Sequence, residues 1–172
     1  MNVNINDMLS FKDESNNNIE NSCLNMNTIN TNLINKGLIK VYSGILWIEE
    51  NELRKSTFND LTIKEMHAID AITMYNHQTI SQVAEKLHLT PGTMTSMADR
   101  LIRKGYVERI RDKDDRRIVR LRLTKRGRVL YRAHRAFHNM MVERFLKGMN
   151  DEEMKVVKKA LQNLEDFVDE HA

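Results

Sequence analysis

The sequence contains very few of the residues that interrupt helices or cross-link chains: one Cys, one Pro and six Gly among 172 residues. Cys23 alone can neither close an internal disulfide nor supply the paired thiolates of a zinc knuckle, which suits a reducing cytoplasm. The scarcity of Pro and Gly predicts a mainly helical fold. No uncharged apolar run approaches the roughly 20 residues of a membrane span, and the Asn-rich start is no secretory signal. We therefore expect a cytoplasmic protein without a membrane partner.

Motifs of the common enzyme classes are missing as well. The sequence has no P-loop, dinucleotide fingerprint, nucleophile elbow or HExxH motif. Adjacent acidic residues such as Glu49 and Glu50 do not share a helix face and cannot act as a catalytic pair. The sequence thus predicts neither an enzyme nor a cofactor site.

The charge is unevenly distributed along the chain. Residues 100–135 hold fifteen basic and four acidic side chains, a net charge of +11, although the whole chain carries only +3. The remaining residues are therefore net acidic, at −8. A concentrated basic block predicts a polyanionic partner.

Three regions are predicted from the apolar pattern. Residues 1–32 contain eleven Asn without helical or alternating periodicity and are predicted to be a disordered arm, with Met26 as an alternative translation start. Residues 33–57 and 125–172 are predicted to be helical. Residues 58–124 are predicted to form a separate domain of helices and two short strands.

The boundaries of the individual elements follow from caps and periodicity. A first helix is expected from Leu33 to about Arg54, and a second after a Thr62/Glu65 capping box to about Tyr75. Ser81 is expected to cap a third helix, and Pro91 to open a fourth that ends at Gly105. The later elements are expected to be strands 106–111 and 117–123, a helix from 125 to about 147 and a last helix from 151.

The order of elements is that of a winged helix-turn-helix: a helix, a tight turn, a second helix and a basic hairpin. The predicted fold class is therefore mainly α (α+β). Helix 91–104 has the diameter to enter a DNA major groove, where small hydroxylated residues allow close approach and hydrogen bonding. The hairpin of residues 106–123, here called the wing, carries arginines suited to a narrow minor groove. The predicted DNA-binding residues are Ser81, Thr90, Gly92, Thr93, Thr95, Ser96, Arg100, Arg109, Arg111, Asp115, Arg116 and Arg117.

Five short motifs follow one another along the chain: Thr93-Met94-Thr95, Asp99-Arg100-Leu101, Lys104-Gly105-Tyr106-Val107, Asp115-Arg116-Arg117 and Leu123-Thr124-Lys125-Arg126-Gly127. In order and spacing they resemble the MarR family of bacterial transcription regulators. The resemblance covers about residues 33–170 and implies an obligate homodimer bound to a pseudo-palindromic operator. In such a dimer, residues 33–57 and 125–172 would form the helical dimerisation region, with the first and last two helices interleaved as a platform, and residues 58–124 would form the DNA-binding domain. It also implies that Asp115 pairs with Arg109 to stiffen the wing and that Arg117 enters the minor groove.

Other segments look like the branch of this family that represses fatty-acid synthesis genes, for which the resemblance implies long-chain acyl-acyl carrier protein as corepressor. They include Ile48-Glu49-Glu50, Ile63-Lys64-Glu65-Met66-His67 and Phe137-His138. The eleven Met are compatible with an adaptable apolar site, and basic residues could dock an acidic carrier. The candidate effector-binding residues are Met66, His67, Ile69, Arg132 and Arg135.

Three histidines leave an alternative open. His134 and His138 are four residues apart on one helix face, a spacing that can chelate a divalent metal, and His67 could join them. Histidines packed at a dimer junction are the simpler interpretation, so no metal is predicted. The alternatives are a zinc- or small-ligand-responsive MarR-type regulator of other genes, and a DNA-binding protein without an effector.

Overall fold

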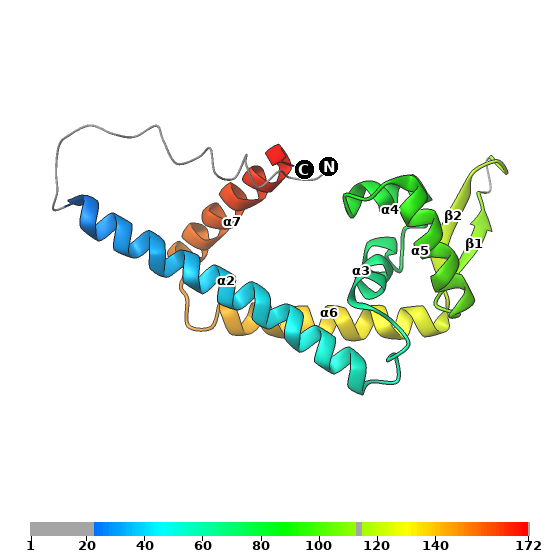
Figure 1. The fold of residues 1–172 in the computed structure, drawn as a ribbon, viewed down its shortest axis with the longest axis horizontal. Coiled ribbons are helices and arrows are strands. Elements are labelled where there is room, and N and C mark those ends of the chain that lie inside the picture. Colours follow the sequence, from blue (N-terminus) through cyan, green and yellow to red (C-terminus); the bar gives the residue numbers. More distant parts are fainter. Residues whose placement is uncertain (1–22, 113–114, 172) are drawn as a thin grey trace. The chain divides into compact units, whose positions relative to one another are not determined.

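The computed structural model describes residues 23–112 and 115–171 and consists of helices with one small sheet (Figure 1). The chain divides between Ile48 and Glu49 into two units. No helix in the described ranges is long and apolar enough to cross a membrane. The elements are α2 (Cys23–Lys55), α3 (Ile63–Ile72), α4 (Ile80–Lys86), α5 (Pro91–Arg103), β1 (Val107–Arg111), β2 (Val119–Leu123), α6 (Lys125–Phe145) and α7 (Asp151–His171). This order confirms the predicted winged helix-turn-helix.

Helix α2 starts earlier than predicted, at Cys23 and not at Leu33. The predicted disordered arm is therefore wrong for residues 23–32, while residues 1–22 of that prediction lie outside the described part. Extending an existing helix gains one hydrogen bond per residue without a new nucleation cost. Asn and Thr oppose helix formation only mildly, and no Pro or Gly precedes Gly37 to stop the helix.

Helix α3 begins as predicted and ends three residues early. The Thr62 hydroxyl accepts the Glu65 N–H at 3.3 Å, and the Glu65 carboxylate accepts the Thr62 N–H at 2.9 Å, which completes the predicted capping box. Ile72 is the last helical residue, where Tyr75 was expected. Thr73 has a φ of 63°, a left-handed conformation that ends the helix and turns the chain.

Helix α4 is capped by Thr79, and the predicted Ser81 cap is wrong. The Thr79 hydroxyl accepts the Gln82 N–H at 3.2 Å, while the Gln82 side chain accepts the Thr79 N–H at 2.9 Å. This pair has the spacing of a capping box, which satisfies two amide groups at once. Ser81 consequently lies one residue inside the helix, with its side chain exposed.

Helix α5 matches its prediction closely. Pro91 is its first residue, and Gly105, with a φ of 77°, follows the Lys104 cap in the left-handed conformation that glycine adopts at low cost. The stripe of α5 that faces inward is fully buried, as expected. Its members are Met94, Met97, Ala98 and Leu101.

The core lies among α3, α4, α5, the two strands and the first turns of α6. Tyr106, at the base of the wing, is fully buried. Its hydroxyl donates a 2.6 Å hydrogen bond to Asp60, and the Arg126 guanidinium lies 4.3 Å from the ring centroid. Burial and the Asp60 carboxylate raise the pKa of Tyr106, so the phenol remains a donor. These contacts fasten the base of the wing to the loop before α3.

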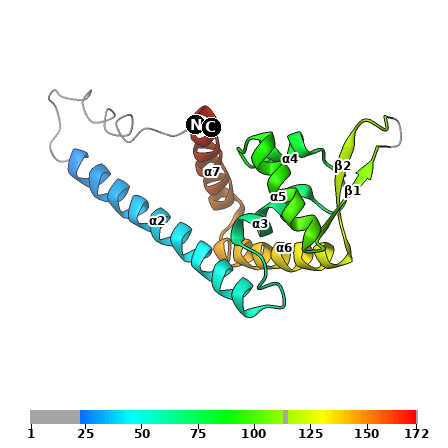
Figure 2. The same ribbon diagram turned by 45° about the vertical axis from the view of Figure 1, so that its right-hand side comes forward.

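The wing is an antiparallel hairpin in which Arg109 lies opposite Leu121. β1 starts one residue later than predicted, at Val107. β2 starts two residues later than predicted because Arg117 and Ile118 belong to the turn, where the Ile118 N–H donates to the Asp115 carbonyl at 3.0 Å. The Leu121 N–H donates to the Gln78 carbonyl at 2.8 Å, which ties β2 to the segment before α4. The hairpin extends away from α3–α5 in both ribbon views (Figures 1 and 2).

Candidate functional site

The outward surface of α5 begins with a group of small polar residues. Thr90 caps the helix by accepting the Thr93 N–H at 3.2 Å, and the two threonine hydroxyls lie 2.8 Å apart. The Thr95 hydroxyl donates to the Pro91 carbonyl at 2.8 Å, which leaves its oxygen lone pairs available to an incoming donor. Gly92, Thr93 and Ser96 are exposed. The side chains on the first turns of α5 are thus short and polar, so a DNA backbone can approach this part of the helix closely.

Arg100 and Lys104, further along α5, converge on one buried carboxylate. Glu65 is only 2% exposed and accepts from Arg100 Nε at 3.4 Å and from Lys104 Nζ at 2.8 Å. The Arg100 side chain remains 44% exposed. Glu65 therefore restrains the Arg100 side chain while the guanidinium stays available to a partner.

The Glu65 network makes stability depend on pH. Burial alone would raise the pKa of Glu65, but hydrogen bonds from Lys104 and the Thr62 N–H, with the Lys104 charge, outweigh it and lower the pKa. A lowered folded-state pKa contributes stability that is present above the unfolded value, near 4.5, and is lost as pH falls through the folded value. We expect Glu65→Gln to lower the free energy of unfolding at pH 7 by roughly 1–3 kcal/mol and to weaken its acid dependence, measured by urea denaturation.

The control for this prediction is Glu108→Gln. Glu108 pairs with Arg122 at 2.9 Å, but its side chain is 44% exposed, so we expect a loss under about 1 kcal/mol. Equal unfolding free energies for the parent and Glu65→Gln at pH 7 would contradict the stabilising role of the network.

The ion pairs of the wing differ from the prediction. Arg109 pairs with Asp99 of α5 at 2.8 Å, and no ion pair joins Arg109 to Asp115 among the described residues. The Asp115 carboxylate instead accepts the Arg117 N–H at 2.9 Å, a local turn contact typical of aspartate. The predicted Arg109–Asp115 pair is therefore wrong: Asp115 caps its own turn, and Arg109 lies beside α5. Arg109 links the wing to α5.

The arginines nearest the tip of the wing remain open to solvent. Arg111, Arg116 and Arg117 are exposed, whereas Arg120 bonds to Asp112 and to the His77 carbonyl. Residues 113–114 of the predicted charged tip lie outside the described residues. The exposed residues of α5, Gly92, Thr93, Ser96 and Arg100, form a candidate nucleic-acid interface together with these arginines. Ser81 on α4 adds an exposed hydroxyl to it.

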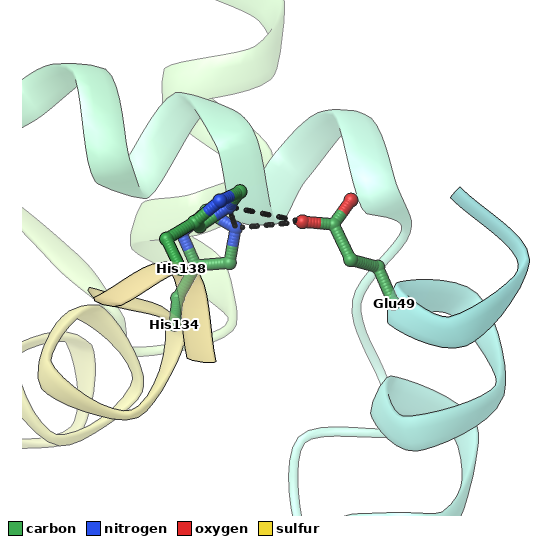
Figure 3. Close-up of side chains that lie close together, drawn as sticks. All are labelled: Glu49, His134 and His138. Carbon is green, nitrogen blue, oxygen red and sulfur yellow. Dashed lines mark hydrogen bonds and ion pairs between the residues drawn. The ribbon is translucent and has the colours of Figure 1, made fainter. Parts of the chain in front are cut away.

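A separate group of ionisable side chains joins Glu49 to α3 and α6, and is called here the histidine cluster: Glu49, His67, His134 and His138. Glu49 Oε1 lies 3.1 Å from Nε2 of both His134 and His138 (Figure 3). Its other oxygen lies 3.2 Å from His67 Nε2. The structure thus brings together all three predicted histidines and adds a carboxylate.

Two members of the histidine cluster are buried. Glu49 is 5% exposed and His134 is 8% exposed. Burial alone would lower the pKa of His134, but Asp70, 3.5 Å from its Nδ1, and Glu49 outweigh that effect and raise it. The same contact with His134 lowers the pKa of Asp70. The negative charge of Asp70 therefore favours the protonated form of His134.

The importance of Glu49 was missed in the sequence, although a signal was available. Glu49 follows Ile45 by four residues and precedes Leu53 by four, so the three side chains lie on one face of α2. Leu53 on this face is buried. A charged residue on an apolar stripe has to be paired when it is buried. That rule, applied together with the His134/His138 spacing, identifies Glu49 as a partner.

Beside the histidine cluster lies a pocket of about 530 Å³. His67 and Arg135, two of the candidate effector residues, line it. Met66 and Ile69 do not line it: they are 5% and 0% exposed, because α3 turns this stripe into the core, and their role in effector binding stays a prediction. Arg132 is exposed and has its Nη1 3.9 Å from Met74 Sδ. The pocket is lined by His67, Asp70, Ala71, Thr73, Lys86, Leu87, Tyr131, His134, Arg135 and His138.

A helix-turn-helix with an exposed polar helix start, followed by an arginine-bearing hairpin, defines a winged-helix DNA-binding protein. The MarR family model matches residues 61–119, from the end of the loop before α3 into β2. The structure of Streptococcus pneumoniae FabT in complex with DNA is similar to this chain, with 45% sequence identity and a TM-score of 0.75. The alignment covers 83% of this chain and 99% of the FabT chain. The chain belongs to the MarR family of transcriptional regulators.

More distant relatives agree with this class. The HTH-type transcriptional repressor MdtR of Bacillus subtilis is 26% identical over 107 residues, 62% of this chain and 69% of MdtR. The S. aureus MepR–DNA complex has the same fold, with 19% identity, a TM-score of 0.62, and coverage of 76% of this chain and 93% of MepR. The chain spans 60 to 69% of the length of the first three curated relatives. Family membership confirms a DNA-binding regulator, not an enzyme.

Proposed function

We propose that the protein is a homodimeric, sequence-specific repressor of fatty-acid synthesis genes, with long-chain acyl-acyl carrier protein as corepressor. The observation that carries the proposal is the 45% identity to FabT over 99% of that chain. It agrees with the fatty-acid branch that the sequence motifs resemble.

The DNA-binding part of the proposal follows the geometry of α5 and the wing. α5 would enter a major groove with Gly92, Thr93 and Ser96 foremost, while Arg100, restrained by Glu65, reaches a base edge or phosphate. Arg117 at the wing would reach the adjacent minor groove. Two half-sites about one helical turn apart, on a pseudo-palindrome, fit two copies of such a unit.

Uncovered apolar side chains support the homodimer. Helix α7 has no buried residue, and six of its large apolar side chains are 37 to 70% exposed in the single chain: Met154, Val156, Leu161, Leu164, Phe167 and Val168. Helix α2 likewise exposes a row of large apolar residues between Leu33 and Ile48. Apolar stripes of this length on two helices need a partner surface. We assign a second copy as that partner, with residues 23–57 and 125–171 as the dimerisation region.

The pocket supports an amphiphilic effector. Leu87, Ala71 and Tyr131 give it apolar walls, whereas Lys86 and Arg135 place two cations at its boundary. The exposed Arg132 lies on the same helix as Arg135 and adds to a basic surface suited to an acidic carrier protein. An effector that binds the DNA-competent form better raises operator affinity.

A gel-shift titration tests this assignment. The full chain is titrated onto promoter DNA of fatty-acid synthesis genes with long-chain acyl-acyl carrier protein, with unacylated carrier protein, or with neither. We expect the acylated carrier to raise operator affinity about 5- to 150-fold, the usual range of allosteric coupling, and the unacylated carrier to have little effect.

A variant and its matched control locate the docking surface. Arg135→Ala should reduce the response to the acylated carrier, whereas Arg144→Ala, an exposed arginine near the end of the same helix, should retain it. An operator affinity that is unchanged by the acylated carrier would remove the corepressor assignment and leave the DNA-binding function standing.

A further inference from the structure

Helix α5 ends in a Schellman motif, in which the residue after the helix cap adopts a left-handed conformation. The Gly105 N–H donates to the Ile102 carbonyl at 3.0 Å. The next N–H, that of Tyr106, donates to the Leu101 carbonyl, also at 3.0 Å. Gly105 has a φ of 77°, which glycine adopts without a steric penalty because it has no Cβ. The residue type thus matches the backbone at this helix end.

Helix α4 ends in the same motif, but with a histidine in the left-handed position. The His88 N–H donates to the Glu85 carbonyl at 3.1 Å. The Leu89 N–H donates to the Ala84 carbonyl at 2.9 Å. His88 has a φ of 50°, where the Cβ of an L-residue crowds the following carbonyl oxygen. His88 therefore stabilises this helix end less than glycine would.

The other left-handed residues are accounted for within the chain. Among the described residues, four have a positive φ: Thr73, His88, Gly105 and Gly148. Two are glycines, and the Thr73 hydroxyl donates to the Asn76 carbonyl at 3.2 Å and accepts the Asn76 N–H at 3.3 Å. The His88 side chain is exposed and forms no hydrogen bond or ion pair with the described part of the chain. Its imidazole is therefore available to a molecule outside the protomer.

The position of His88 favours DNA as that molecule. His88 lies in the tight turn between α4 and α5, two residues before Thr90, which caps α5 (Figure 1). In a helix-turn-helix the second helix enters the major groove by its N-terminal residues, and the first helix crosses the phosphate backbone. Two residues of chain span at most about 7 Å, so an imidazole at residue 88 can reach a phosphate beside the start of α5.

An effector is the less suitable partner. Lys86 and Leu87, the two residues before His88, line the pocket, and His88 does not. An imidazole N–H is an ordinary donor to a phosphate oxygen. Backbone strain of this kind is also typical of residues that hold a ligand.

We infer that the His88 imidazole donates a hydrogen bond to a phosphate of the bound DNA at the turn between α4 and α5. This contact accounts for a histidine where the backbone alone favours glycine. The inference rests on the DNA-binding function and is independent of the fatty-acid assignment. Because phosphates carry no sequence information, the contact should contribute alike to promoter DNA and to DNA of random sequence.

Two substitutions separate the hydrogen bond from the backbone conformation. His88→Leu has a similar size and no donor, whereas His88→Gln keeps an N–H donor, and neither introduces glycine. Fluorescence anisotropy of the full chain with labelled fatty-acid synthesis promoter DNA and with a random-sequence duplex measures the affinities. We expect His88→Leu to lower both affinities about 5- to 15-fold, and His88→Gln to stay within about 2-fold of the parent.

His88→Gly tests whether the side chain serves DNA binding at the expense of the fold. Glycine relieves the left-handed strain, so the melting temperature should equal that of the parent or exceed it by up to about 4 °C. Both DNA affinities should nevertheless fall as in His88→Leu. The matched control is His171→Leu, which removes an exposed histidine at the end of α7 and should bind both duplexes like the parent.

The contrary results are distinct. Parent-like affinity of folded His88→Leu for both duplexes, or a loss confined to the promoter DNA, would overturn the phosphate contact. A His88→Gly protein less stable than the parent would contradict the backbone argument. A parent that binds neither duplex would overturn the DNA-binding function itself. Circular dichroism of each variant establishes that it is folded.

Discussion

Replacing Arg117 by alanine is expected to weaken operator binding by roughly 1–3 kcal/mol, about 5- to 150-fold, and to reduce the salt dependence of binding. Arg117 is exposed at the wing, and its backbone N–H donates to the Asp115 carboxylate at 2.9 Å. The turn therefore fixes where the side chain starts and leaves the guanidinium available. Fluorescence anisotropy with labelled operator at several salt concentrations measures both effects.

Arg144→Ala is the matched control, because it removes the same charge from the far end of α6. It should leave affinity and salt slope close to the parent values. Equal operator affinity for Arg117→Ala and Arg144→Ala would contradict the role of the wing in DNA binding.

Gly127→Ala is expected to destabilise the fold by about 2–3 kcal/mol, and to lower the melting temperature by roughly 4–12 °C. A Cβ at residue 127 would lie 2.2 Å from the Tyr106 carbonyl oxygen, a backbone atom that cannot rotate away. That oxygen also accepts the Thr124 N–H at 3.0 Å and the Thr124 hydroxyl at 3.1 Å. The substitution would therefore separate the start of α6 from the base of the wing.

Gly37→Ala supplies the control for the steric argument. A Cβ at residue 37 meets nothing within 4 Å, and in the interior of α2 alanine should stabilise the helix by about 0.5–1 kcal/mol. Thermal unfolding followed by circular dichroism compares the two variants with the parent. A Gly127→Ala protein as stable as the parent would contradict the close approach of α6 to Tyr106.

Local sequence signals predicted most of the DNA-binding domain. Pro91 and Gly105 define the ends of α5 through backbone constraints that depend on neighbouring residues alone. Thr62 and Thr124 cap their helices for the same reason. The Thr79/Gln82 capping box was equally local and was overlooked in favour of Ser81.

Features that depend on distant contacts could not be read from one sequence. Arg109 had charged partners available in several segments, and only the packing of β1 beside α5 selects Asp99. Met66 and His67 are adjacent on α3, yet one faces the core and the other faces Glu49. The low helix propensity of Asn predicts a late start for α2, but the small cost of extending an existing helix outweighs it, and α2 starts at Cys23.

Hydroxyl-radical footprinting of the operator, with the parent and with Arg117→Ala, tests the central claim most directly. The account predicts two protected half-sites about one helical turn apart, each flanked by a minor-groove protection that is lost in the variant while the central protections remain. A single protected half-site, or flanking protection that persists without Arg117, would contradict a dimeric repressor that reads DNA through α5 and the wing.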